Sequence, residues 1–149
     1  MIKKRGYWFY GYSGAGKTFA SNYFRRKIKN CIIIDGDAVR KYISFDLKYS
    51  KKHRDLQITR VYGIARISID SNLFPIISTV WMNKMVLKKA KSSGIKVIKI
   101  NNSKNYHQKL IKKKIKKNIV GHDIFYENFK TFEITNTKNS NFKKLLCKI

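Results

Sequence analysis

The feature that most constrains this chain is a glycine-rich segment near its start, Gly11–Thr18, which reads G-Y-S-G-A-G-K-T. It matches the pattern G-x-x-x-x-G-K-[ST] in full, and a chance match in a chain of this size has odds on the order of one in a hundred. An apolar run precedes the segment and a helical pattern follows it. Because such glycines let successive backbone N–H groups point at phosphate oxygens, the segment predicts a nucleoside triphosphate site.

Two residues of this phosphate loop have distinct expected roles. Lys17 reaches the β- and γ-phosphates of ATP, and the Thr18 hydroxyl holds Mg²⁺. The helix that begins near Lys17 adds the positive end of its dipole. The residues expected to bind the phosphates are Gly11, Ser13, Gly14, Ala15, Gly16, Lys17 and Thr18.

The rest of the chain alternates apolar runs with longer helical patterns, which is typical of a parallel α/β sheet. Strands are expected at Tyr7–Tyr10, Cys31–Ile34, Phe74–Val80, Ile95–Ile100 and Phe132–Thr135. Helices are expected at Lys17–Lys29, Lys51–Ser71 and Asn83–Ser92, with another at the C-terminus. In the long helix, Ile58, Val61, Ala65 and Ile69 recur at helical spacing and predict one buried face. The prediction is an α/β fold of the P-loop NTPase type in one small domain, residues 1–149.

The charge balance is extreme, with 34 Lys and Arg against 8 Asp and Glu and a formal net charge of +26. Such a balance is common in proteins that bind polyanions. The lysines are nevertheless spread over the chain beside many Ile and Asn, a mixture that an A/T-rich genome also produces. The one dense cluster, between Lys109 and Lys117, fits a solvated face and a phosphate-contacting role equally well.

Other global features point to a cytoplasmic protein without a membrane partner. No run of about 18 apolar residues exists. The basic N-terminus leads into an aromatic strand, unlike a signal peptide. Two cysteines, Cys31 and Cys147, suggest neither a disulfide framework nor a metal cluster, and the three histidines lack metal-ligand spacing. Cys31 and Trp8 are expected in the core, whereas Trp81 could line a pocket or cap the core.

An acidic pair follows the second expected strand, in Asp35-Gly36-Asp37. In a parallel sheet this edge binds ligands, and here it lies beside the phosphate loop. An Asp-Gly turn is the alternative, but two of only 8 acids at this edge favour function. One carboxylate can help hold Mg²⁺, directly or through water, and the other can accept or orient the proton of an acceptor hydroxyl. Catalytic roles are predicted for Lys17, Asp35 and Asp37, and metal-binding roles for Thr18 and Asp35.

Basic and polar residues follow the acidic pair. Arg40 is expected to start the next helix near the same edge, and Arg54 and Gln57 share one face of the long helix. Arg60 follows them. Guanidinium groups at this edge can hold an anionic acceptor with bidentate hydrogen bonds.

The loop by itself predicts a nucleotide and not a reaction. The chain lacks the four hydrophobic residues followed by Asp-Glu of many ATPases, and it lacks the Asn-Lys-x-Asp base reader of GTPases. A small-molecule kinase therefore fits best.

Taken in order, these motifs resemble the adenylylsulfate (APS) kinase family over roughly residues 6 to 136. The matching segments are Gly11–Thr18, Asp35–Arg40, Asp46–Ser50, His53-Arg54, Gln57–Val61 and Gly121–Glu127. The resemblance implies ATP with Mg²⁺ and phosphorylation of a ribose 3′-hydroxyl on a nucleotide-type acceptor.

The resemblance also assigns roles to residues. It implies that Asp37 is the acid nearest the acceptor hydroxyl, and that Arg40, Arg54 and Gln57 match the acceptor-binding Arg, Arg and Asn. Tyr49 takes the place of a phenylalanine that stacks on the acceptor base. The assigned lid lysine is Lys109. Family members commonly pair, so a homodimer is compatible with the resemblance.

The departures from the family fall on the acceptor side. The family's Ile-Ser-Pro-Tyr after the third strand is replaced by Val80–Asn83, Asn by Gln57, Asp by His53, and one of the paired arginines by Thr59. The lid signature is nearly erased. This pattern predicts that the phosphoryl-transfer chemistry is kept while the acceptor differs.

Two acceptors are the leading candidates. A branch similar to APS kinase acts on cytidine diphosphoramidate in bacterial capsule biosynthesis, and this acceptor is slightly favoured over APS. The competing class is a basic nucleic-acid-binding protein with a vestigial nucleotide site, for which the net charge is the support. The intact Lys17-Thr18 pair together with Asp35 and Asp37 favours the enzyme. A nucleoside or nucleoside monophosphate kinase would leave the series from Asp35 to Arg60 unexplained.

Overall fold

The computed structural model describes residues 4–102, 119–121, 123–137 and 141–149. Its elements, in chain order, are β1 (Gly6–Tyr10), α1 (Lys17–Arg25), β2 (Cys31–Asp35), α2 (Gly36–Tyr42), α3 (Lys51–Asp70), β3 (Phe74–Thr79), α4 (Lys84–Ser92), β4 (Ile95–Asn102), β5 (Phe132–Asn136) and α6 (Asn141–Cys147). The five strands pair in parallel in the order β2-β3-β1-β4-β5. This arrangement confirms the predicted α/β class with a parallel sheet.

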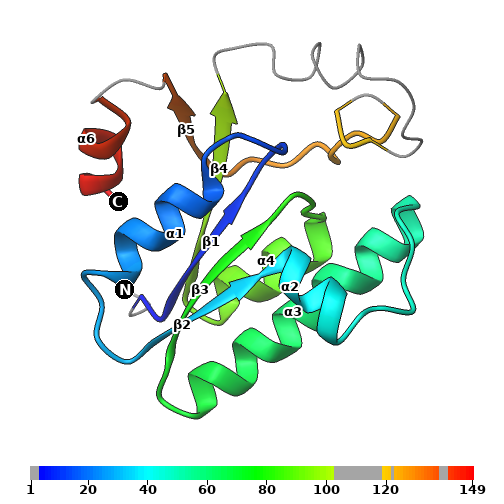
Figure 1. The fold of residues 1–149 in the computed structure, drawn as a ribbon, viewed down its shortest axis with the longest axis horizontal. Coiled ribbons are helices and arrows are strands. Elements are labelled where there is room, and N and C mark those ends of the chain that lie inside the picture. Colours follow the sequence, from blue (N-terminus) through cyan, green and yellow to red (C-terminus); the bar gives the residue numbers. More distant parts are fainter. Residues whose placement is uncertain (1–3, 103–118, 122, 138–140) are drawn as a thin grey trace.

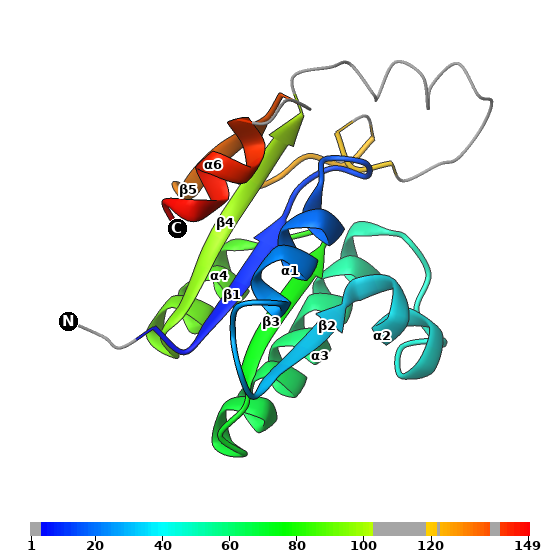
Figure 2. The same cartoon turned by 60° about the vertical axis from the view of Figure 1, so that its left-hand side comes forward.

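Helices cover both faces of the sheet, with α1 and α6 on one side and α3 and α4 on the other (Figures 1 and 2). β1 lies in the middle, and every residue in it is buried. Its side chains alternate between the two cores: Tyr7 and Phe9 pack on the α1 side, and Trp8 and Tyr10 on the α3 side. The central strand therefore holds the two helical layers together, and it ends directly at the phosphate loop.

The long helix α3 confirms the predicted buried face. Ile58, Val61, Ala65 and Ile69 are at most 2% exposed. Burying a side chain of the size of Ile or Val stabilises a fold by about 1.5–3 kcal/mol. Ser50 starts the helix, since its hydroxyl accepts the backbone N–H of His53. The first turns of α3 thus lie at a fixed place beside the sheet edge where the strands end.

The element ends differ from the predictions in a few places. The helix after the phosphate loop ends at Arg25 and not at Lys29, and the third strand ends at Thr79. The helix after β2 begins at Gly36, so Arg40 lies inside α2 and does not start a helix. Cys31 is only half-buried, contrary to prediction, because β2 is an edge strand. The lysine cluster, with Lys109, and His107 and His122 lie outside the described residues.

In the described part of the chain, no helix combines the length and the apolar character that crossing a membrane requires.

Trp8 is fully buried in the core, as predicted.

Candidate active site

A cleft of about 680 Å³ opens where β2 and β3 end beside the phosphate loop. Residues of three sequence motifs line it. They are Ser13, Gly14, Lys17 and Thr18 of the loop, Asp35, Gly36 and Asp37 of the acidic segment, and Arg40, Tyr49, Arg54 and Gln57 from the following helices and their connection. The structure therefore brings together the predicted acidic residues, the described acceptor-binding residues and four of the loop residues, whereas Gly11, Ala15 and Gly16 do not line the cleft.

The phosphate loop has a backbone that only glycine accommodates at two positions. Gly11 has φ 152°, and a Cβ there would lie 2.2 Å from the carbonyl oxygen of Ile100. Gly16 has φ 106°, and a Cβ there would lie 2.5 Å from the Asn136 side chain. Gly16 also precedes α1, whose first turn has neither an acidic residue nor a side-chain cap. The N–H groups at the start of α1 are thus available to an anion.

Lys17 lies under this loop. Its Nζ donates hydrogen bonds to the carbonyl oxygens of Gly11 (2.9 Å) and Tyr12 (2.8 Å). Burial lowers the pKa of Lys17 to about 8, although the nearby charges of Asp37 and Asp35 oppose this shift. A triphosphate in the loop would supply the negative charge that the buried ammonium lacks.

The two acids do different things. Asp35 caps α2: one carboxylate oxygen accepts the N–H groups of Asp37 (3.0 Å) and Ala38 (3.2 Å), and the other accepts the Ser78 hydroxyl (2.8 Å). Asp37, the second residue of α2, lines the cleft and is exposed. Its carboxylate has no hydrogen-bond partner among the described residues. Asp37 is therefore the acid that can accept a proton from a ligand, while Asp35 is held in place.

The two side chains predicted to bind the metal ion both bear oxygen donors. The Thr18 hydroxyl and the Asp35 carboxylate line the same cleft. No group of three or more His, Cys, Asp or Glu side chains within the described ranges could hold a metal ion by itself. Such a donor set fits Mg²⁺, which binds to one or two protein oxygens and completes its shell with phosphates and water.

The part of the cleft that the resemblance predicts to bind the acceptor, called the acceptor half below, consists of side chains around Tyr49. The guanidinium of Arg40 lies 4.7 Å from the centre of the Tyr49 ring and that of Arg54 lies 5.6 Å from it. Arg54 Nε also donates to the Tyr49 carbonyl oxygen (3.1 Å), and burial with the neighbouring Arg40 charge lowers the pKa of Arg54. Gln57 is 5% exposed, and its Nε2 donates to the Gly36 carbonyl oxygen (3.0 Å). Two cations and an exposed aromatic ring together suit an anionic nucleotide.

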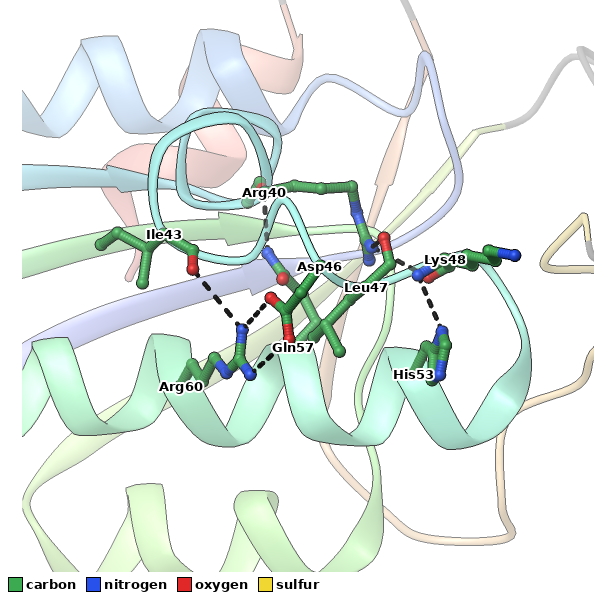
Figure 3. A network of polar contacts seen from close by, with 9 residues as sticks. Arg40, Ile43, Asp46, Leu47, Lys48, His53, Gln57 and Arg60 are labelled. Carbon is green, nitrogen blue, oxygen red and sulfur yellow. Dashed lines mark hydrogen bonds and ion pairs between the residues drawn. The ribbon is translucent and has the colours of Figure 1, made fainter.

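The connection between α2 and α3 that carries Tyr49 is held at several points (Figure 3). Arg40 Nη1 donates to the carbonyl oxygens of Leu47 (3.1 Å) and Lys48 (2.9 Å), and Lys48 N donates to His53 Nδ1 (2.7 Å). Arg60 forms a two-pronged ion pair with Asp46, with 2.8 Å between Nη2 and Oδ2. Arg60 thus anchors the connection and does not line the cleft, unlike Arg40 and Arg54.

A stack of three aromatic rings lies at the remaining wall, and two of them, Tyr126 and Tyr12, were not assigned to the site from the sequence. Trp81 lines the cleft and stacks on Tyr126, with 5.5 Å between ring centres, and Tyr126 stacks on Tyr12 of the phosphate loop at 5.6 Å. The Tyr126 hydroxyl donates to the Val80 carbonyl oxygen (2.6 Å), and burial raises the Tyr126 pKa well above its usual value. Trp81 is only 2% exposed. It therefore fills both of the roles considered for it, as part of the core and as part of the pocket wall.

Comparison with known proteins agrees with this geometry. The model of the adenylylsulphate kinase family matches residues 4–135. The chain is 37% identical over 76 residues to the bifunctional enzyme NodQ of Rhizobium sp. (strain N33). The aligned segment covers 48% of this chain and 12% of the relative. It is 29% identical over 96 residues to an adenylyl-sulfate kinase of Bacteroides fragilis (strain YCH46). This alignment covers 60% of this chain and 48% of the relative. The chain thus spans less than half the length of these relatives.

Solved structures show the same fold at low sequence identity. The APS kinase CysC of Mycobacterium tuberculosis, in complex with AMPPNP and APS, superposes with a TM-score of 0.77 at 17% identity, over 100% of both chains. A hexameric APS kinase from Thiobacillus denitrificans gives a TM-score of 0.64 at 16% identity, over 99% of this chain and 28% of that one. These likenesses confirm the P-loop NTPase type of the fold. Since the family model matches most of its length, the chain belongs to the adenylylsulphate kinase family.

Proposed function

We propose that the protein is an ATP-dependent kinase that transfers the γ-phosphate of ATP, with Mg²⁺, to the ribose 3′-hydroxyl of a nucleotide-type acceptor. One observation carries the proposal: the phosphate loop and Asp37 line the same cleft as Arg40, Tyr49, Arg54 and Gln57. A donor site and an acceptor site that share one cleft are what direct phosphoryl transfer requires.

The roles of the residues follow from their positions. The loop N–H groups and Lys17 hold the β- and γ-phosphates. Asp37 orients the acceptor hydroxyl and takes its proton as the oxygen attacks the γ-phosphorus and the bond to the bridging oxygen breaks, which leaves ADP. Thr18 and Asp35 would hold Mg²⁺, which neutralises charge that develops on the phosphates. Arg40 and Arg54 hold the anionic part of the acceptor against Tyr49, and Gln57 lines the same half.

Cytidine diphosphoramidate, an intermediate of capsule biosynthesis, is the acceptor that we favour, and APS is the second candidate. The changes at Gln57 and at Val80–Asn83 support the first, since both places lie at the acceptor half of the cleft, whereas the phosphate loop is unchanged. Both acceptors present a base, a ribose and a short anionic group, which Tyr49 and the two arginines suit.

The test is to incubate the protein with ATP, Mg²⁺ and each acceptor separately, and to follow ADP release together with the mass of the product. A 3′-phosphorylated product from one acceptor identifies both reaction and substrate. If ATP binds and neither acceptor is phosphorylated, the acceptor assignment is wrong, and salt-sensitive RNA binding is the next property to measure.

The proposal includes a cytoplasmic enzyme that works as a homodimer, because members of the family commonly pair. Light scattering coupled to size-exclusion chromatography measures the oligomeric state directly. A monomer at micromolar concentration with full activity would contradict this part of the proposal and leave the reaction untouched.

A further inference from the structure

The segment Val80–Asn83 links β3 to α4 and forms part of the acceptor wall. It stands where the family has Ile-Ser-Pro-Tyr, so a large indole at Trp81 replaces a small hydroxyl side chain. Val80 and Trp81 line the cleft, and Trp81 is almost completely buried. The position of this indole therefore decides how much room an acceptor has.

A single carboxylate holds both polar side chains of this segment. Asp55 Oδ1 accepts the indole N–H of Trp81 (2.8 Å) and the side-chain amide N–H of Asn83 (2.8 Å). The other end of the Asn83 side chain caps α4, where its Oδ1 accepts the Val86 N–H (2.8 Å). Asp55 thus joins α3 to the start of α4 through the residues that differ from the family.

The position of Asp55 in α3 explains why its contacts matter for the acceptor. It directly follows Arg54 and precedes Gln57 by two residues, and both of those side chains line the cleft. Asp55 itself does not line the cleft; it points to the segment behind the wall. One turn of helix thus carries two acceptor-binding side chains and the group that holds the opposite wall.

Other hydrogen bonds fix the backbone of the segment, whereas apolar packing in the core, Tyr126 and Asp55 together hold the Trp81 ring. The Thr79 hydroxyl donates to the Trp81 carbonyl oxygen (2.9 Å), and the Tyr126 hydroxyl donates to that of Val80. Apolar packing and the stacking on Tyr126 bury the indole and set its plane, but both kinds of contact are weakly directional. The hydrogen bond to Asp55 adds the directional contact, since the indole has only one donor.

We propose that Asp55 is a positioning residue of the acceptor site: by fixing the Trp81 indole it sets the shape of the wall that the acceptor meets. The proposal rests on the proposed function, because it concerns the acceptor of that reaction. Asp55 does not line the cleft, so we expect its loss to act on acceptor binding and to leave ATP binding largely unchanged.

Two variants separate the hydrogen bonds from the negative charge. Asp55→Ala removes the acceptor oxygen and leaves two donors unpaired, and we expect the acceptor KM to rise about tenfold while the KM for ATP changes less than about twofold. Asp55→Asn keeps an oxygen at the same place, and we expect it to behave like the parent protein. Asp70→Ala serves as the matched control, because Asp70 is an exposed acid at the far end of the same helix.

Indole N–H signals in ¹⁵N NMR spectra provide a readout that does not depend on turnover. The chain has two tryptophans, Trp8 and Trp81, and the Trp81→Phe variant assigns their signals. Loss of the hydrogen bond in Asp55→Ala should shift the Trp81 signal upfield and leave the Trp8 signal, whose N–H donates to Thr79, in place. Acceptor binding is measured in the same spectra from the displacement of the Trp81 signal.

The outcomes distinguish this inference from the proposed function. If the parent protein phosphorylates neither acceptor, the proposed function fails, and weaker binding of cytidine or adenosine monophosphate to Asp55→Ala than to Asp55→Asn still supports the positioning role. If the parent protein is active and Asp55→Ala retains the acceptor KM, the inference is overturned. It is also overturned if ATP binding weakens as much as acceptor binding, since that result describes a general loss of structure.

Discussion

The donor half and the acceptor half of the cleft differ in the groups that form them. The donor half is mostly backbone: a glycine-rich loop, with Gly11 and Gly16 in conformations that a side chain would disturb. The acceptor half is made of side chains from α2, α3, the connection between these helices and the β3–α4 link. A backbone site tolerates few residue changes because its geometry is the function, whereas a side-chain site can be altered one residue at a time. The departures from the family accordingly lie on the acceptor side.

The largest expected effect is a loss of the rate of phosphoryl transfer that leaves ligand binding in both halves of the cleft nearly unchanged. We expect Asp37→Asn to lower kcat by about a hundredfold or more, because the amide cannot take the acceptor proton, while ATP affinity changes little. Asp35→Asn is the informative comparison, since Asp35 mainly caps α2 and its change should lower stability as well as rate. The measurements are single-turnover rates, ATP affinity by calorimetry and melting temperature. An Asp37→Asn enzyme with nearly full kcat would remove Asp37 from the mechanism.

The second prediction concerns the donor half alone. Burial holds the pKa of Lys17 at about 8, below its ordinary value, so the free protein loses this charge as pH rises through 8. Bound triphosphate favours the ammonium, so ATP binding takes up a proton above this pH. The affinity for ATP is therefore full below pH 8 and should fall by about thirtyfold between pH 7 and pH 9.5.

Calorimetry in buffers of different ionisation enthalpy measures this proton uptake. Lys17→Arg provides the control: its guanidinium stays charged, so its ATP affinity should be lower at neutral pH but nearly flat up to pH 9.5. A parent protein with equally flat affinity would show that Lys17 is already paired by Asp37 and Asp35, and that the donor half needs no ligand to hold its charge.

The third prediction concerns the acceptor half alone. Arg54→Lys keeps a positive charge but loses the planar fork and the Nε bond to Tyr49, and we expect the acceptor KM to rise about tenfold with an unchanged KM for ATP. Arg66→Lys, in the same helix but paired with Asp70 outside the cleft, is the control. If the KM for ATP rises as well, the two halves are not separate sites.

The donor half could be predicted from the sequence because its residues are neighbours in the chain. Eight consecutive residues specify the loop, and the apolar run and helix beside it are equally local. The sheet followed from the same kind of signal, since each strand is an apolar run with clear ends. The start of α2 at Gly36 was not predicted, because Asp35 both ends β2 and caps α2. With no residues between the two elements, Asp35-Gly36-Asp37 has the sequence of a turn.

The acceptor half was only partly predictable, for a physical reason. The spacing from Arg40 to Gln57 places these residues on neighbouring helices, and they do meet in the cleft. The bonds from Asp55 to Trp81 and Asn83 span 26 and 28 residues. No local pattern encodes such pairs. One signal was available: in a chain with 8 acids, a carboxylate beside Arg54 indicates a specific partner.

The smallest expected effect tests where the acceptor half ends. Arg60 holds Asp46 and lies 3.5 Å from the Ile43 carbonyl oxygen, so it supports the connection that carries Tyr49 without lining the cleft. The two side chains are 38% and 48% exposed, and ion pairs in contact with water contribute little, so Arg60→Ala should raise the acceptor KM by less than about threefold. Asp46→Ala should give the same small change, and the double variant no more than either one, because each change breaks the same pair. Salt at about 1 M should weaken the effect further, since it screens exposed charges. A tenfold rise for Arg60→Ala with none for Asp46→Ala would mean that the guanidinium contacts the acceptor itself, and the acceptor half would then extend one turn further along α3.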